Sequence, residues 1–569
     1  MKKILLTAFV AFVGLSLLAQ KEGRQPYDIQ KSAFGEKAMV VTAHPIASKV
    51  GLEVLKSGGN AVDAAIAVHF ALAVVYPQAG NIGGGGFLLY RKADGEVAAL
   101  DYRETAPALA GKDMFLDENG NPVPGLSTLG CLSAGVPGSV DGMYEAFKKY
   151  SKLKNWRRLV QPAVRLAAKG FPITKQEADN LNELKKDFEK YNTVVPVFVR
   201  EKPWKPGDVM VQSDLAATLR LIRDRGRSGF YEGPVAAKIV QQMRASRGII
   251  SAEDLKNYRS VWRKPLGGKY RGYDVVGMPP PSSGGVALLQ LLGIMEHTNL
   301  SAFGFHSPQA VHQMIEAERR VYADRATHLG DPDYFKVPIE RLLDSIYLFR
   351  RFQSIDTSKA TKSTDISAAD FSGHESDQTT HFSIVDENGD AVSCTTTLNN
   401  SYGSKTVVAG AGFLLNDEMD DFSVKPGVPN MYGLVGAEAN AIAPGKRMLS
   451  SMTPTIVSKD GKLFMVLGSP GGSTIITTVF QNIVNVIDFG MSAQDANFAP
   501  RFHQQWLPEH SSIERDGRLP EETLKILESK GHVFKERGYI GRLEMILATP
   551  DGRLEGAADK RGDDHAEGY

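Results

Sequence analysis

The run QTTHFS at residues 378–383 most constrains how this chain can fold, because it places a strand-like sequence directly after a polar segment deep inside the sequence. Its β-branched threonines and alternating apolar residues favour a strand, and the simplest interpretation is an ordinary edge of a sheet. A second interpretation follows if the bond between Gln378 and Thr379 is cut. Thr379 then gains a free α-amine, which can act as the general base for its own weakly nucleophilic hydroxyl.

Further motifs occur in a fixed order on both sides of this run. They are GGNAVDAA at 58–65, GGGGF at 83–87, DYRE at 101–104, TLN at 397–399, NDEMDDF at 416–422, LSSM at 449–452 and GSPGGS at 468–473. Several ordered motifs are far more specific than any single one. Together they resemble the γ-glutamyltranspeptidases, a family of N-terminal-nucleophile hydrolases, over nearly the whole chain.

The resemblance implies an α+β fold, a four-layer αββα sandwich in which two sheets lie between helical layers. It also implies that the chain cuts itself between Gln378 and Thr379. The expected parts are a signal peptide at residues 1–19, a large subunit at 20–378 and a small subunit at 379–569. The two subunits are expected to stay together as one folded unit.

Local patterns agree with sheets covered by helices. Apolar periodicity predicts helices on either side of Gly58-Gly59 and over 475–487, and a helix-rich stretch between about 111 and 370. Turn dipeptides Asp94-Gly95, Asn388-Gly389 and Asp460-Gly461 predict three hairpins. Their strands are expected at 87–90 and 97–102, at 380–385 and 391–398, and at 453–457 and 463–467.

Acyl transfer needs a nucleophile, a base and donors for the developing oxyanion. Gly471 and Gly472 lie between a predicted strand and helix, so their amides can meet an oxyanion, although a plain turn is the simpler interpretation. The resemblance implies that Thr379 is the nucleophile and that these glycines form the oxyanion hole. It also places the hydroxyls of Thr397 and Thr380 beside the nucleophile.

The same resemblance implies a γ-glutamyl substrate, which presents an α-carboxylate and an α-ammonium. A cation with hydroxyl donors suits the carboxylate, and carboxylates with an amide suit the ammonium. The residues implied are Arg103, Ser450 and Ser451 for the first set, and Asn399, Glu418 and Asp421 for the second. Solvated surface charges are the simpler interpretation of a lone arginine or aspartate. Position 418 is Gln or Glu within the family, and Tyr432 matches a lid over the pocket.

The chain has 569 residues, of which 42% are hydrophobic and 23% charged, with a formal net charge of +1. This composition is that of a globular protein and gives no basis for expecting a nucleic-acid partner. A charged start, an apolar run at 4–18 and Ala19 predict a secretory signal, since the run is shorter than the roughly 20 residues of a spanning helix. A periplasmic or secreted protein is therefore expected.

The two cysteines, Cys131 and Cys394, are far apart in sequence, and export would permit a disulfide without requiring one. Cys394 lies in an alternating run and is expected to be a small buried side chain. The sequence lacks CxxC and HExxH motifs, so no metal site is expected, and the resemblance implies no cofactor. The implied small-molecule partners are glutathione and other γ-glutamyl compounds, with amino acids, peptides or water as acceptors.

Two alternatives remain. Another amidase of the same family, such as a cephalosporin acylase, would act on a different acyl group, although the presence of both substrate-binding sets favours a γ-glutamyl group. A non-catalytic exported binding protein would keep the pocket but never mature. Self-cleavage separates this second alternative from an enzyme.

Overall fold

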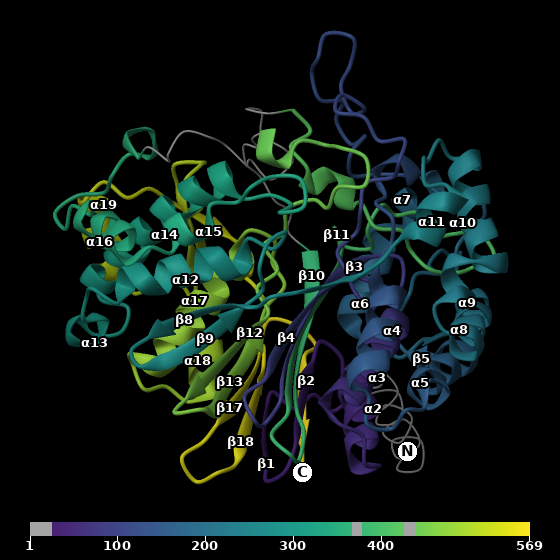
Figure 1. Ribbon diagram of the computed structural model, residues 1–569, viewed down its shortest axis with the longest axis horizontal. Coiled ribbons are helices and arrows are strands. Elements are labelled where there is room, and N and C mark those ends of the chain that lie inside the picture. The colour runs from purple at the N-terminus through teal and green to yellow at the C-terminus, as the bar shows by residue number, and fades with distance from the viewer. Residues whose placement is uncertain (1–24, 367–377, 426–437) are drawn as a thin grey trace, which may run out of the picture.

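Two seven-stranded sheets lie face to face at the centre of the protein, and helices cover the outer face of each (Figure 1). The computed structural model describes residues 25–366, 378–425 and 438–569. Helices α2 (Pro45–Lys56) and α3 (Ala61–Val75) cover one sheet, and α12 (Gly284–Met295) and α17 (Thr474–Ile487) cover the other. The expected α+β four-layer αββα sandwich is confirmed.

The first sheet contains the strand that begins at the expected cleavage point. Every neighbouring pair in it is antiparallel. In spatial order its strands are β19 (His565–Gly568), β2 (Met39–Thr42), β10 (Gln378–Val385), β11 (Ala391–Asn399), β3 (Gly85–Arg91), β4 (Val97–Asp101) and β7 (Val261–Arg263). This sheet therefore contains strands from both sides of residue 378.

The second sheet is also antiparallel throughout and mixes early and late segments in the same way. Its strands are, in spatial order, β1 (Ser32–Gly35), β18 (Leu554–Ala558), β17 (Glu544–Ala548), β13 (Lys462–Gly468), β12 (Thr455–Lys459), β9 (Tyr273–Gly277) and β8 (Leu266–Tyr270). The facing sides meet in a dry core that includes Val41, Leu89, Ile456, Val466 and Ile546. Alternate residues of each strand fill this core because side chains alternate across a strand.

The three predicted hairpins are confirmed as β3–β4, β10–β11 and β12–β13. Each turn carries a glycine with positive φ, namely Gly95, Gly389 and Gly461. A residue without a Cβ adopts this conformation at little cost, which explains why a local dipeptide predicted these turns.

The predicted helical pair before residue 76 is confirmed as α2 and α3. All fifteen residues of α3 are buried, and a capping box between Asn60 and Asp63 begins the helix.

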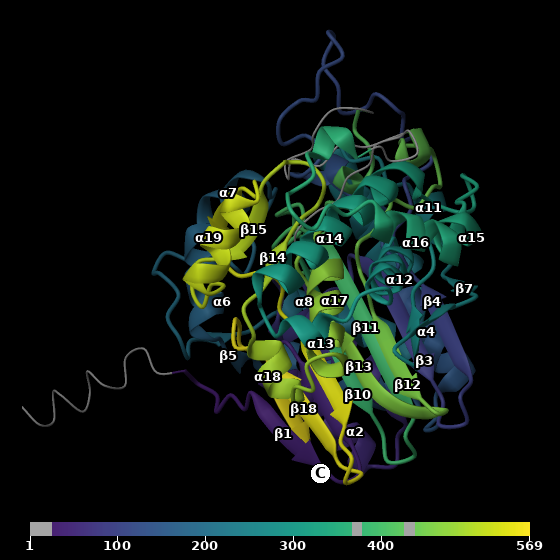
Figure 2. The same cartoon turned by 90° about the vertical axis from the view of Figure 1, so that its left-hand side faces the viewer.

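On the opposite side of the molecule, α14 (Pro308–His328) lies beside α12 (Figure 2). Among the described residues, no helix has the length and apolar character needed to cross a bilayer.

Further elements complete the helical layers and the rim. The remaining α-helices are α4 (Ser139–Tyr150), α5 (Trp156–Lys169), α6 (Lys175–Glu183), α7 (Lys185–Lys190), α8 (Ser213–Arg225), α9 (Ser228–Tyr231), α10 (Gly233–Ala245), α11 (Ala252–Asn257), α13 (Leu300–Phe303), α15 (Ile339–Leu342), α16 (Ser345–Gln353), α18 (Ala493–Phe498) and α19 (Glu521–Ser529). Two small sheets contain β5 (Phe171–Pro172), β6 (Val209–Met210), β14 (Phe502–His503), β15 (Ser511–Glu514) and β16 (Phe534–Arg537). Both cysteine thiols are free and buried, as expected for Cys394.

Candidate active site

Thr379 is the second residue of β10, a central strand of the first sheet. It lies opposite Thr397 of β11, and the register shifts between Gln378 and Thr379. The Thr379 side chain is buried, with 6% of its surface exposed. The expected nucleophile is therefore held at a strand end by ordinary sheet pairing, next to an irregularity in the ladder.

Thr379 also lines a cavity of about 240 Å³ between the two halves of the fold. The same cavity is lined by Tyr76, Gly471 and Arg542. The Arg542 guanidinium donates to the Tyr76 hydroxyl at 2.5 Å and pairs with the buried Asp564 carboxylate at 2.9 Å. A small substrate thus has a route to Thr379 past fixed polar groups.

Gly471 and Gly472 connect the end of β13 to the start of α17, as predicted. Their φ angles are +131° and +56°, and their carbonyls accept from the amides of Thr474 and Ile475 at 3.1 and 3.0 Å. Neither glycine amide donates to another group within the described parts of the chain. Gly471 lines the cavity that contains Thr379, and the oxyanion role of the two amides stays a prediction.

Arg103 lies at the centre of a buried charge cluster, here called the Arg103 cluster, with Glu104, Glu418 and Asp421. Its guanidinium lies 2.5 Å from Glu418 Oε2 and 3.5 Å from Glu104 Oε2, and it donates to Asp421 Oδ2. Arg103 is fully buried. The simpler interpretation of Arg103 and Asp421 as solvated surface charges is wrong.

One guanidinium faces three carboxyl groups in this cluster. Burial raises the pKa of Glu418 well above its usual range, and the same cause raises the pKa of Asp421 and brings that of Glu104 to about 8. Arg103 opposes these shifts but cannot neutralise all three groups. Burial therefore favours the protonated forms of these carboxyl groups, and a bound cation would favour release of their protons.

The end of β11 connects the nucleophile to the acidic motif. Thr397 Oγ1 accepts from the amide of Asn399 at 2.8 Å, and Asn399 Nδ2 donates to the carbonyl of Asp417 at 2.9 Å. Asn399 has a φ of +76°, which turns the chain away from the strand. These contacts place Asn399 between Thr397 and the residue that precedes Glu418.

Ser450 and Ser451 follow Leu449, whose carbonyl accepts from Arg103 at 3.1 Å. The amide of Ser450 donates to the carbonyl of Pro281 at 2.9 Å, and Ser451 Oγ accepts from Arg325 at 3.4 Å. The serine motif therefore lies against the Arg103 cluster. Sequence reasoning placed the cation and the carboxylates on opposite sides of the substrate, whereas Arg103 contacts Glu418 and Asp421 directly.

Sequence reasoning missed buried asparagines, among them Asn81 beside the glycine run at 83–86. Asn81 Nδ2 donates to the carbonyl of Thr397 at 2.9 Å, and its Oδ1 accepts from the amide of Gly84 at 3.1 Å. A Cβ on Gly84 would lie 2.0 Å from that Thr397 carbonyl oxygen. Asn81 lies two residues before the GGGGF motif, and no sequence pattern marks it. Tyr432 and the expected signal peptide lie outside the described residues.

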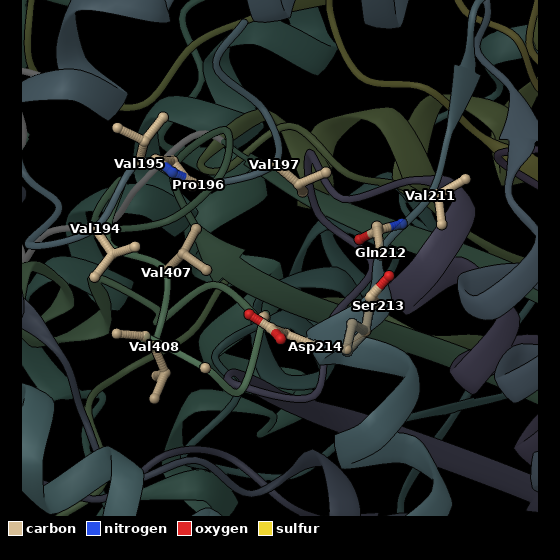
Figure 3. Close-up of a pocket in the computed structure, with 14 residues that line it drawn as sticks. Val194, Val195, Pro196, Val197, Val211, Gln212, Ser213, Asp214, Val407 and Val408 are labelled. Atoms are coloured by element: carbon tan, nitrogen blue, oxygen red, sulfur yellow. The ribbon is translucent and has the colours of Figure 1, made fainter.

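A second cavity of about 250 Å³ lies on the helical side of the first sheet (Figure 3). Valines from separate segments line it, among them Val194, Val195, Val211 and Val407. It contains none of the predicted site residues. The cavity beside Thr379 is therefore the better candidate for chemistry.

The Gamma-glutamyltranspeptidase family model matches residues 47–569. The chain belongs to this family. Its resemblance to the "Glutathione hydrolase proenzyme" of Escherichia coli strain K12 is 46% identity over 550 residues, which covers 95% of this chain and 94% of that protein. The family expectation from the sequence is confirmed.

Solved structures support the fold. The cephalosporin acylase from Bacillus halodurans superposes with a TM-score of 0.82 at 25% identity, covering 96% of this chain and 98% of that one. The Helicobacter pylori gamma-glutamyltranspeptidase superposes with a TM-score of 0.57 at 44% identity, covering 60% of this chain and 97% of that one. Membership of the γ-glutamyltranspeptidase family makes this chain a precursor of an N-terminal-nucleophile enzyme.

Proposed function

We propose that this protein is an exported γ-glutamyltransferase and glutathione hydrolase that cuts itself between Gln378 and Thr379. The observation that carries the proposal is the pairing of Thr379 with Thr397 in one sheet, with β11 leading directly to the buried Arg103 cluster. The apolar run before Ala19 supports export, and cell fractionation tests it. The subunit boundaries at residues 20–378 and 379–569 are part of this proposal.

Maturation uses the hydroxyl of Thr379 against its own peptide bond. Oγ attacks the carbonyl carbon of Gln378, the C–N bond breaks, and the nitrogen takes a proton to become the α-amine of Thr379. Water then hydrolyses the resulting ester and releases the carboxylate of Gln378. The Thr397 hydroxyl, on the residue that faces Thr379 in β11, assists these proton transfers.

In the mature enzyme the freed amine takes the hydroxyl proton as Oγ attacks the γ-carbonyl of the substrate. The amides of Gly471 and Gly472 stabilise the oxyanion, and the leaving amine receives the proton. The γ-glutamyl ester on Thr379 is then resolved by water or by the amine of an amino acid or peptide. These reaction steps require no cofactor.

Recognition of the γ-glutamyl group exchanges one set of ion pairs for another. The substrate's α-carboxylate binds Arg103 and the hydroxyls of Ser450 and Ser451. Its ammonium group binds Glu418, Asp421 and the side-chain amide of Asn399. Arg103 and its carboxyl partners are already buried, and a zwitterion carries no net charge, so its insertion leaves the net charge of the cluster unchanged.

A cephalosporin acylase activity is the second candidate, since the cephalosporin acylase from Bacillus halodurans superposes on 96% of this chain. A glutaryl group carries the carboxylate but lacks the ammonium. Glu418 and Asp421 would then be left without a cation, which is costly for buried carboxylates. The cluster therefore favours a γ-glutamyl group, and a glutaryl anilide compared with the γ-glutamyl anilide separates the two.

The first test is purification of the chain without residues 1–19, followed by denaturing electrophoresis and N-terminal sequencing of each band, beside Thr379→Ala. Two fragments, the smaller beginning at Thr379, and an intact variant are expected. Release of p-nitroaniline from its γ-glutamyl anilide then tests the activity. A wild-type chain that stays whole under folding conditions would support a non-catalytic binding protein instead.

A further inference from the structure

Asn440 is a buried side chain that joins two separate parts of the candidate site. Only 1% of its surface is exposed. Its Nδ2 donates to the backbone carbonyl of Asp421 at 2.7 Å, and its Oδ1 accepts from the backbone amide of Leu449 at 3.0 Å. One planar amide therefore sets the separation between the acidic segment and the segment that leads into Ser450.

Arg103 makes the same connection from the other side. Its guanidinium pairs with the Asp421 carboxylate and donates to the carbonyl of Leu449 at 3.1 Å. Arg103 and Asn440 therefore each contact both Asp421 and Leu449, so the four residues form a closed ring of hydrogen bonds. Arg103 must open its side of the ring to take a substrate carboxylate, whereas Asn440 can keep its contacts throughout.

Lys446 fixes the backbone on which Asn440 stands. Its Nζ donates to the carbonyls of Ala439 and Ala441 at 2.8 and 2.9 Å, which are the residues on either side of Asn440. The amide of Ser423 donates to the Asn440 carbonyl at 2.9 Å. With its carbonyl and both neighbouring carbonyls bonded, the backbone at residue 440 has little freedom to shift.

We propose that Asn440, held by Lys446, is a positioning residue that fixes the distance between Asp421 and Ser450 for binding of the γ-glutamyl group. The inference rests on the proposed function, because the two segments bind opposite charges of one α-amino acid. A rigid support lowers the ordering cost of binding, so its loss weakens substrate affinity more than the chemical step. Asn440 itself need not touch the substrate.

The test compares Asn440→Ala and Asn440→Asp with the wild type, using γ-glutamyl-p-nitroanilide. Asn440→Asp keeps the acceptor for Leu449 and loses the donor to Asp421. For both variants we expect KM to rise about tenfold, with kcat within about threefold of the wild type and processing complete. Lys446→Met is expected to raise KM in the same direction.

Asn497→Ala is the matched control. Asn497 is equally buried, and its Nδ2 donates to the carbonyls of Leu543 and Ala557 at 2.9 and 3.1 Å, on strands outside the Arg103 cluster. This variant should lower the midpoint of thermal unfolding without raising KM. An equal rise of KM in Asn497→Ala, or an unchanged KM in Asn440→Ala, would overturn the proposal.

Amide hydrogen exchange measured by mass spectrometry tests the positioning role of Asn440 in the absence of substrate. In Asn440→Ala the peptides that contain residues 421–423 and 448–451 should exchange faster, while the remaining sheet peptides keep wild-type rates. Unchanged exchange in both peptides would overturn the positioning role. A wild type that processes but releases no p-nitroaniline would instead reject the proposed function, and the exchange data would still decide the role of Asn440.

Discussion

Thr379 and Thr397 stand directly opposite each other in the antiparallel pair of β10 and β11. Side chains of directly opposed residues project from the same face of a sheet, with their Cβ atoms about 4.5–5.5 Å apart. The Thr397 hydroxyl is itself oriented by the amide of Asn399 at 2.8 Å. Sheet register alone therefore brings an oriented hydroxyl close to the proposed scissile bond.

Replacement of Thr397 by Val should slow self-cleavage and lower kcat by about tenfold or more, because the side chain keeps its shape and loses its hydroxyl. Thr397→Ser should retain most of the wild-type rate of self-cleavage and most of the wild-type kcat. Band intensities over time after dilution from denaturant measure the first effect. Thr396→Val, on the opposite face of β11, should reduce stability without selectively slowing cleavage.

Arg103→Lys should leave self-cleavage intact and raise KM for γ-glutamyl substrates by about tenfold or more. Lys keeps the positive charge but cannot hold two partners in the planar geometry of a guanidinium. Steady-state kinetics measure the effect. Arg320→Lys is the control, because the buried Arg320 pairs with Glu316 at 2.7 Å within α14, outside the Arg103 cluster. An Arg103→Lys enzyme with wild-type KM would contradict the assigned carboxylate partner.

The KM for a γ-glutamyl anilide should fall as pH rises from about 5.5 to about 7.5, a range in which an α-amine stays largely protonated. The raised pKa values of Glu418 and Asp421 leave part of the population protonated at the acidic end. Only the carboxylate forms attract the substrate ammonium, so binding improves as protons leave.

Glu418→Gln removes one of these titrating groups and should flatten that KM profile while the pH dependence of kcat is kept. Its effect on stability should be small, since one buried carboxyl is lost from a cluster in which three face one arginine. An equally steep KM profile in the variant would assign the titration to other groups.

Gly471→Ala should reduce kcat strongly. Residue 471 has a φ of +131°, and an added Cβ would lie 2.5 Å from Thr474 Oγ1, so the turn and its amides must move. Oxyanion donors typically contribute about 2.7–4 kcal/mol to the transition state. Gly461→Ala is the control, because it also has positive φ, +75°, but no heavy atom within 4 Å of the added Cβ. It should lower stability and leave kcat unchanged.

The local parts of the fold could be predicted because their signals are local. The turns at Gly95, Gly389 and Gly461 require a positive φ angle, which glycine adopts readily. The fully buried helix α3 consists almost entirely of apolar residues. The pairing of β10 with β2 has no such signal, because the two strands lie far apart in the sequence and become neighbours only in the folded sheet.

The candidate site divides in the same way. Residues within family motifs, such as Arg103 and Asp421, could be named from the sequence, but their direct contact spans 318 positions and had to be seen in three dimensions. Asn81 and Asn440 could not be assigned from the sequence, because a single asparagine in a loop has no periodicity or spacing that predicts which distant carbonyl it will bind.

Each sheet contains strands from before and from after residue 378, which has a consequence for the history of the molecule. Once the bond before Thr379 is cut, neither piece holds a complete sheet, and the tether that guided their assembly is gone. The mature protein would then owe its persistence to a high barrier against coming apart, since two separated pieces must find each other before they can refold. The cut that creates the nucleophile would thereby make folding a one-time event.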